Sequence, residues 1–131
     1  MTYQEVLRMA DKFLGAWNTQ DVELTVAVYT DDVTYLDPNT RGPVRGSAAM
    51  RRYLTKLFAN WQMHWSLREA HLFEGGDGCA ILWHATLRPI GTDPSRDIHI
   101  DGMDFVQVRD GRISRNEVYF DRMALAALMS A

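Results

Sequence analysis

Asp37 is the residue whose type and position are best suited to chemistry. It stands in the segment Tyr35-Leu36-Asp37-Pro38, and the alternation of side chains along a strand puts Val33 and Tyr35 on the same face as the carboxylate. Burial among apolar groups raises the pKa of a carboxyl group, and a general base that works near neutral pH requires a raised pKa. Alternatively, Asp37 forms an Asx turn before Pro38 and bonds neighbouring backbone N–H groups.

Asp104 is the second carboxylate that could take part in catalysis. Strand alternation places six residues of its segment on one face and six on the other, namely Ile98, Ile100, Gly102, Asp104, Val106 and Val108 against Asp97, His99, Asp101, Met103, Phe105 and Gln107. Asp104 thus lies among aliphatic residues, and Gly102 leaves room for a ligand or a backbone to approach it. Alternatively, Asp104 pairs across the sheet with an arginine such as Arg88 or Arg115.

Histidines and known cofactor motifs give weaker signals. His84 follows Trp83 in the most apolar run of the chain, where we expect it to be buried, either as a proton-transfer group or as a hydrogen-bonded core residue. The alternating patterns around His64, His71 and His99 are typical of surface or inter-strand positions. No His, Cys or carboxylate pair has a metal-ligand spacing such as H-E-x-x-H, and Gly-x-Ser-x-Gly, P-loop and Gly-x-Gly-x-x-Gly motifs are missing. We therefore expect neither a metal nor a cofactor.

Composition limits the class of protein that these residues can serve. A chain of 131 residues with 47% apolar and 24% charged residues is typical of one globular domain, here 1–131. A formal charge of -3 provides no cationic surface for nucleic acid. Cys79 is the single cysteine and cannot form an internal disulfide, which fits a reducing cytoplasm. Without a signal-like N-terminus or an apolar run of about 20 residues, we expect a cytoplasmic protein that does not bind membranes.

The first half of the chain shows helical periodicity. Apolar residues at spacings of three and four predict helices over residues 3–17 and 22–30. A third helix is predicted from Ser47, as its N-cap, to Asn60. A short strand over 33–37 and a loop rich in turn-forming residues, from Pro38 to Gly46, separate the second helix from the third.

The second half changes to the pattern of strands. β-branched and aromatic runs predict four long antiparallel strands over 63–73, 79–90, 97–109 and 112–120. Glycine-rich turns join the members of each hairpin, and Asp110-Gly111 is the strongest of these turn signals. The apolar segment 123–129 is short, so we expect a C-terminal turn or a contact with a partner.

Helices followed by an antiparallel meander predict an α+β fold in which a strongly curved sheet wraps around the N-terminal helices as a cone. If side chains do not fill its concave face, the interior becomes an apolar pocket for a small ligand. Aromatic side chains that could line such a pocket come from both the helices and the strands: Phe13, Trp17, Tyr53, Trp61 and Phe120.

Several segments resemble the ketosteroid isomerase and SnoaL-like polyketide cyclase group. They are Ala16-Trp17-Asn18-Thr19-Gln20-Asp21, Tyr29-Thr30-Asp31-Asp32-Val33, Tyr35-Leu36-Asp37-Pro38, Gly42-Pro43-Val44-Arg45-Gly46-Ser47-Ala48-Ala49-Met50, Val106-Gln107-Val108-Arg109-Asp110-Gly111-Arg112-Ile113 and Val118-Tyr119-Phe120-Asp121. The resemblance covers nearly the whole chain and implies the nuclear transport factor 2-like cone fold. It does not specify the reaction, because this fold carries isomerases, cyclases, dehydratases, epoxide hydrolases and binding proteins.

The resemblance also implies roles for individual residues. Asp37 matches the proton-shuttling base of the isomerases, and Asp104 matches the aspartate that stays protonated and donates a hydrogen bond to the enolate oxygen. Phe13 stands where the isomerases have an oxyanion-binding tyrosine, so one donor is missing unless Tyr35 or Tyr53 replaces it. Where cyclases and epoxide hydrolases have a catalytic aspartate on the last strand, this chain has Val118.

Together these observations predict a small-molecule enzyme, isomerase- or cyclase-like, that transfers a proton next to the carbonyl of a largely apolar or aromatic compound. Asp37 would be the base and Asp104 the neutral acid. The predicted lining of the substrate pocket is Phe13, Trp17, Tyr35, Tyr53, Trp61, His84, Asn116, Val118 and Phe120. The alternatives are a non-catalytic protein that binds a hydrophobic ligand and an assembly role for the exposed sheet face. Met103 and Phe105 on that outer face predict a homodimer.

Overall fold

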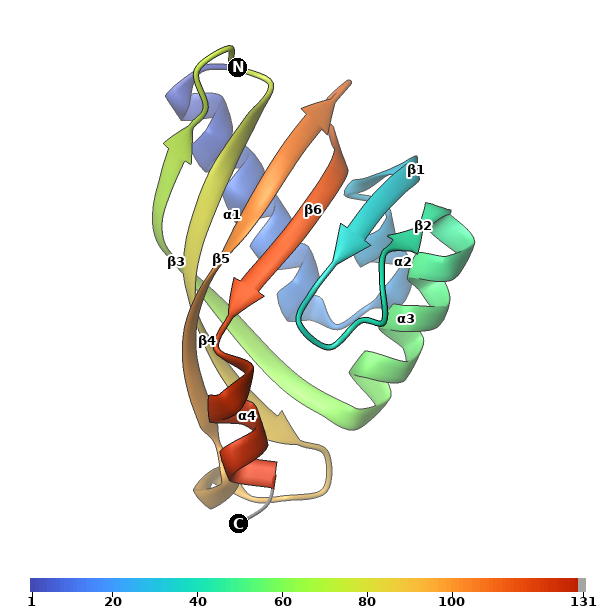
Figure 1. Cartoon of the computed structure of the whole chain (residues 1–131), viewed down its shortest axis with the longest axis vertical. Helices are drawn as coiled ribbons and strands as arrows, with labels where there is room; N and C mark the ends of the chain where they lie inside the picture. Colours follow the sequence, from blue (N-terminus) through green and yellow to red (C-terminus); the bar gives the residue numbers. More distant parts are fainter. Residues whose placement is uncertain (130–131) are drawn as a thin grey trace.

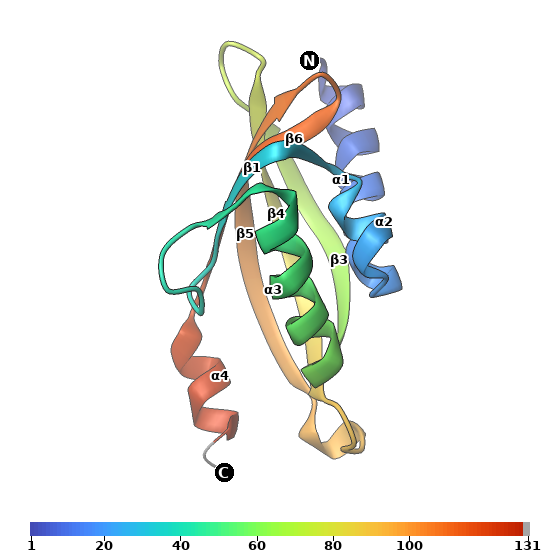
Figure 2. The same cartoon turned by 90° about the vertical axis from the view of Figure 1, so that its right-hand side faces the viewer.

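The computed structural model describes residues 1–129, so the last two residues of the predicted domain 1–131 lie outside it. Three helices come first: α1 (Tyr3–Thr19), α2 (Val22–Val26) and α3 (Gly46–Asn60). Figures 1 and 2 show that they lie against one face of a curved sheet. None of the helices within the described range is long and apolar enough to cross a membrane.

The sheet has six strands in the order β2-β1-β6-β5-β4-β3 and does not close. Their bounds are β1 (Tyr29–Leu36), β2 (Val44–Arg45), β3 (Trp61–Leu72), β4 (Gly78–Pro89), β5 (Ile98–Arg109) and β6 (Arg112–Phe120). The short helix η1 (Pro94–Arg96) joins β4 to β5, and α4 (Arg122–Met129) follows β6 at the end of the chain (Figure 1). The predicted α+β cone is confirmed, with four long antiparallel strands after the helices.

The strand that leads into Asp37 begins earlier than the sequence predicts. The predicted helix 22–30 ends at Val26, and β1 begins at Tyr29. Tyr29 pairs with Ile113 in a parallel register between β1 and β6, and its side chain is almost fully buried. Pairing with a strand 84 positions later therefore overrides the weak helical pattern of a short segment.

The start of α3 also differs from the prediction. Arg45 is the N-cap residue and forms no side-chain capping bond, while the Ser47 hydroxyl lies 3.5 Å from the Asp31 carbonyl oxygen. Gly46 has φ +81°, a conformation that favours glycine. The chain can therefore turn directly from β2 into the helix, and the observed cap lies two residues before the predicted one. The predicted helix end at Asn60 and the Asp110-Gly111 turn are confirmed, the latter with positive φ at both residues.

The outer face of the sheet provides intrachain partners for some of its apolar side chains. The Phe105 ring lies 5.0 Å from the Phe73 ring, centroid to centroid, and the Arg115 guanidinium lies 4.5 Å from the Phe105 centroid. Tyr119 on the same face is 51% exposed. Phe105 thus has neighbours within its own chain, and the predicted homodimer stays a prediction.

Candidate active site

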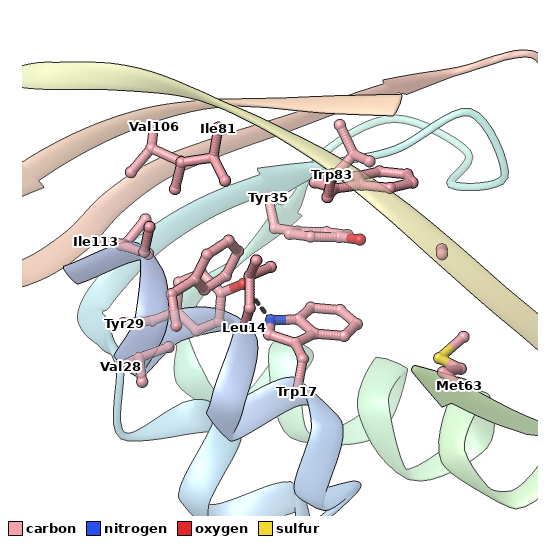
Figure 3. Close-up of a cluster of buried hydrophobic side chains, with 14 of the residues drawn as sticks. Leu14, Trp17, Val28, Tyr29, Tyr35, Met63, Ile81, Trp83, Val106 and Ile113 are labelled. Carbon is pink, nitrogen blue, oxygen red and sulfur yellow. Dashed lines mark hydrogen bonds between the residues drawn. The ribbon is translucent and has the colours of Figure 1, made fainter. Parts of the chain in front are cut away.

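A cavity lies between the concave face of the sheet and the helices. It contains about 630 Å³ of space free of atoms, its open mouth included. The lining is largely apolar and aromatic: Phe13, Leu14, Trp17, Tyr35, Asp37, Asn39, Tyr53, Leu57, Trp61, Met63, Trp65, Leu87, Asp104, Asn116, Val118, Phe120 and Leu125. Figure 3 shows the Trp17 and Tyr35 rings lying over one another, with centroids 6.1 Å apart and an interplanar angle of 25°. Every predicted site residue except His84 lines this cavity.

His84 lies on the opposite side of the sheet, so its predicted place in the pocket is wrong. Trp83 and Ala85 are buried on the inner face of β4, and alternation turns the residue between them outward. The His84 side chain is 41% exposed, its Nδ1 lies 2.8 Å from an Asp101 carboxylate oxygen, and its ring stacks on that of His99.

No group of three or more potential ligands that could hold a metal ion is found in residues 1–129.

The Asp37 carboxylate uses its two oxygens differently. Oδ1 accepts hydrogen bonds from the backbone N–H groups of Asn39, at 2.7 Å, and Thr40, at 3.0 Å, which is the Asx turn foreseen as the alternative. Oδ2 accepts hydrogen bonds from the hydroxyl of Tyr35, at 2.8 Å, and from that of Tyr53. The side chain is only 8% exposed. The turn thus fixes one oxygen, and two phenols from β1 and α3 hold the other at the cavity.

Both phenols remain hydrogen-bond donors at physiological pH. Burial first, and neighbouring groups that include the Asp37 charge, raise the pKa of Tyr35 and Tyr53 above the ordinary value for tyrosine. Each hydroxyl proton is therefore retained and directed at Asp37. Four donors converge on this carboxylate, which compensates for its removal from water.

Asp104 has a different environment. It is 4% exposed and accepts one hydrogen bond, from Trp83 Nε1 at 3.1 Å. Desolvation raises the pKa of Asp104 to about 7. The Trp83 hydrogen bond and the nearby Asn116 amide oppose this rise, and the negative charge of Asp37 adds to it. Near neutral pH this carboxyl group is thus present in both protonation states.

The arginine pairing considered for Asp104 is wrong. Arg88 pairs with Asp97, with Nε 2.6 Å from Oδ1, and Arg115 pairs with Glu117, with Nη2 2.8 Å from Oε1. Both ion pairs lie on the outer face, and no cation pairs with Asp104 within the described part of the chain. A buried acid without a cationic partner in a concave pocket is typical of a functional site.

A buried hydrogen-bonded chain borders the Asp104 side of the cavity. Trp17 Nε1 donates to the Tyr29 hydroxyl at 3.1 Å, the dashed contact in Figure 3, and that hydroxyl donates to Asn116 Oδ1 at 2.8 Å. Asn116 Nδ2 and Trp65 Nε1 are buried without a hydrogen-bond partner. Trp65 was not predicted as a pocket residue, although Met63 and Trp65 alternate with the polar Gln62 and His64 along β3, and this alternation places Trp65 on the inner face.

Gly102 supports Asp104 through packing. An added Cβ at Gly102 would lie 2.7 Å from Trp83 Cζ2 and 2.8 Å from the Tyr119 carbonyl oxygen. The space that the sequence assigned to a ligand or backbone is thus occupied by the indole ring that donates to Asp104.

We therefore expect Gly102→Ala to destabilise the protein by about 2 kcal/mol, since overpacking of a core forces side chains and backbone to shift. The measurement is urea unfolding followed by circular dichroism. Gly15→Ala is the matched control, because a Cβ at Gly15 meets open space and alanine favours the helix by about 1 kcal/mol. Equal stability of the Gly102 variant and the wild type would contradict the packing described here.

The comparisons with known proteins are consistent with this geometry. A family model described as a SnoaL-like domain matches residues 10–116, and no curated protein matches the chain. Among solved structures, a candidate polyketide cyclase from Xanthomonas campestris pv. campestris has a TM-score of 0.82 at 20% identity, covering 95% of this chain and 96% of the other. SalBIII, an epoxide hydrolase/cyclase-like enzyme with a role in pyran ring formation in the polyether salinomycin, has a TM-score of 0.79 at 21% identity, covering 92% and 94%.

A further neighbour carries the name of the fold. An NTF2-like protein of unknown function from Burkholderia pseudomallei has a TM-score of 0.81 at 15% identity, and each chain is covered completely. At these identities structural similarity establishes the fold alone, whereas the family model matches most of the sequence. The chain belongs to the SnoaL-like domain family.

Proposed function

We propose that this protein is a small-molecule enzyme that transfers a proton next to the carbonyl group of a largely apolar substrate, in an isomerase- or cyclase-like reaction. The observation that carries the proposal is Asp104, a buried carboxyl group with a pKa near 7 that faces the same cavity as Asp37 and has no cationic partner among residues 1–129. A buried acid of this kind lowers the stability of the folded protein. Its presence in a largely apolar pocket therefore favours an acid–base role.

In the proposed reaction Asp37 and Asp104 take opposite parts. Asp37 Oδ2 removes the proton from the carbon next to the carbonyl, and the C–H electron pair moves into an enolate. Neutral Asp104 donates a hydrogen bond to the carbonyl oxygen and stabilises the charge that develops there. If a carbon–carbon double bond is conjugated with the enolate, return of the proton from Asp37 to its far carbon gives an isomer. Attack of the enolate on a second carbonyl carbon of the same molecule closes a ring, and the alkoxide that forms takes the proton held by Asp37.

The cavity lining supports a flat, largely apolar substrate. Trp17 and Tyr35 lie nearly parallel to one another, and Trp65 packs edge-on against Trp83 with centroids 4.6 Å apart. Aromatic rings of this kind bind ring systems by stacking and edge-to-face contact. A ketone fused to an aromatic ring combines the apolar body and the acidic α-proton that this proposal requires.

The experiment that tests the proposal is α-proton exchange of 2-tetralone in D₂O, followed by ¹H NMR. We expect exchange above the buffer rate, saturable in ketone, and a rate that falls about tenfold per pH unit above pH 7 as Asp104 loses its proton. Exchange at the buffer rate from a protein that binds the ketone would contradict catalysis and favour the alternative, a non-catalytic binding protein.

A further inference from the structure

We infer that Asn116 Nδ2 is a second hydrogen-bond donor to the ligand's carbonyl oxygen, beside Asp104, and that Tyr29 and Trp17 are positioning residues that hold this amide in place. The inference rests on the proposed function in one respect only: it treats the carbonyl oxygen of the ligand as part of a reacting substrate. The donor site itself requires an acceptor oxygen whether or not a reaction follows.

The hydrogen-bonded chain fixes which end of the Asn116 amide faces the cavity. An indole N–H can only donate, so Trp17 Nε1 must donate to the Tyr29 oxygen. The single Tyr29 hydroxyl proton is then directed at Asn116, which must present its carbonyl oxygen, Oδ1, in return. Nδ2 is therefore left on the opposite side of the amide.

Asn116 Nδ2 lies beside Asp104 on the concave face. In the β5–β6 register Asp104 pairs with Val118 and Val106 pairs with Asn116, so Asp104 and Asn116 are diagonal neighbours whose side chains point to one face. Both line the cavity. Asn116 is fully buried, with 0% exposure. Its Nδ2 forms no hydrogen bond of ordinary geometry, although it lies near enough to the Asp104 carboxyl to lower the pKa of that group. A buried donor in this state is unusual and marks a place for an acceptor.

Most other polar donors of the cavity are already committed, although Trp65 Nε1 also lacks a hydrogen-bond partner. The hydroxyl protons of Tyr35 and Tyr53 are directed at Asp37, and Trp83 Nε1 is directed at Asp104. Phe13, which packs edge-on against the Tyr29 ring, brings no hydroxyl. Asn116 stands on β6, which pairs directly with the strand of Asp104, whereas Trp65 stands on β3, two strands away from it. The Asn116 amide is thus the unpartnered donor placed to accompany the carboxyl.

This arrangement selects for one kind of ligand atom. Two donors, the protonated carboxyl of Asp104 and the Asn116 amide, suit an oxygen that only accepts hydrogen bonds, such as that of a ketone or quinone. An amine or a protonated heterocycle at the same place would bring N–H groups against the Asn116 amide. While Asp104 is protonated, the site therefore favours carbonyl compounds over apolar ligands of similar shape that carry a donor.

The test uses 2-tetralone labelled with ¹³C at the carbonyl, observed by infrared difference spectroscopy and by α-proton exchange. In Asn116→Leu the bound carbonyl stretch is expected to move to higher frequency than in the wild type, and the exchange rate at saturation to fall about 100-fold with a smaller change in KM. Tyr29→Phe releases the amide, so we expect a broadened carbonyl band and a loss of about tenfold. Tyr119→Phe removes an exposed hydroxyl that donates to Glu117 and is expected to match the wild type.

Two outcomes separate this inference from the proposed function. A carbonyl band that depends on Asn116 in a protein without exchange activity keeps the donor site and overturns catalysis. Wild-type exchange and an unchanged band in Asn116→Leu overturn the inference and leave the proposed function standing. If the leucine variant does not fold, the Asn116 side-chain amide signals of the ¹⁵N-labelled wild type provide the test. We expect their ¹H shift to move downfield on addition of the ketone, and no movement would overturn the inference.

Discussion

Asp37→Asn is expected to slow the exchange of 2-tetralone α-protons about 1000-fold, because positioned general bases contribute factors of about 10² to 10⁴ and the amide has no basic oxygen. Asparagine keeps an oxygen that can accept from the Asn39 and Thr40 N–H groups, so the turn is expected to persist. The measurement is the exchange rate at saturating ketone and pH 7, with circular dichroism as the check on folding.

Asp32→Asn is the matched control for this prediction. Asp32 lies on β1, the strand that ends just before Asp37, is exposed, and pairs with Arg109 outside the cavity. We expect this variant to exchange protons at the wild-type rate. A rate for Asp37→Asn within about threefold of the control would remove Asp37 from the proposed mechanism and direct attention to Asp104 as the base.

Asp104→Asn is expected to stabilise the protein by an amount that increases with pH. Burial raises the pKa of Asp104 from its ordinary value of 3.8 to about 7, so between these pH values the folded state holds a proton that the unfolded state has released. The contribution of a neutral Asp104 is fully present below about pH 4 and is lost as the pH rises through 7. Asparagine does not titrate and can still accept the Trp83 hydrogen bond, so it escapes this loss.

The rise in the pKa of Asp104 from 3.8 to about 7 corresponds to roughly 4 kcal/mol. We therefore expect the free energies of unfolding of the variant and the wild type to be similar at pH 4 and to differ by up to this amount at pH 8, in urea titrations at both pH values. Asp101→Asn is the control, since a hydrogen bond from His84 lowers the pKa of Asp101 and the sign of its pH dependence is reversed. A difference that is the same at pH 4 and pH 8 would contradict the assignment.

These two variants separate the contributions of the carboxyl groups. Asp37 is held by four hydrogen bonds and is expected to matter for rate, whereas Asp104 is held by one and is expected to reduce stability at neutral pH. A protein selected for stability alone would replace Asp104 with an apolar or amide side chain. The proposed acid role explains why Asp104 is present at the centre of a concave sheet.

The local sequence determined much of the site. Alternation in a strand depends only on the backbone, so placing Asp104 among aliphatic residues, and Tyr35 with Asp37, required no knowledge of the fold. The Asp37-Pro38 turn was predictable for the same reason, because an Asx turn bonds residues within three positions of one another. Element types followed from periodicity, and most strand bounds agree to within two residues.

Only the tertiary structure decided which partners these residues meet. The Trp83 ring fills the space beside Gly102, a contact between neighbouring strands that no local pattern contains. The arginines considered for Asp104 lie on the other face of the sheet. Tyr29 reaches Asn116 across 87 positions because β1 pairs in parallel with β6. Composition and spacing thus specify faces and turns, while strand order and register specify which buried donors and acids share one cavity, since those contacts join residues far apart in the chain.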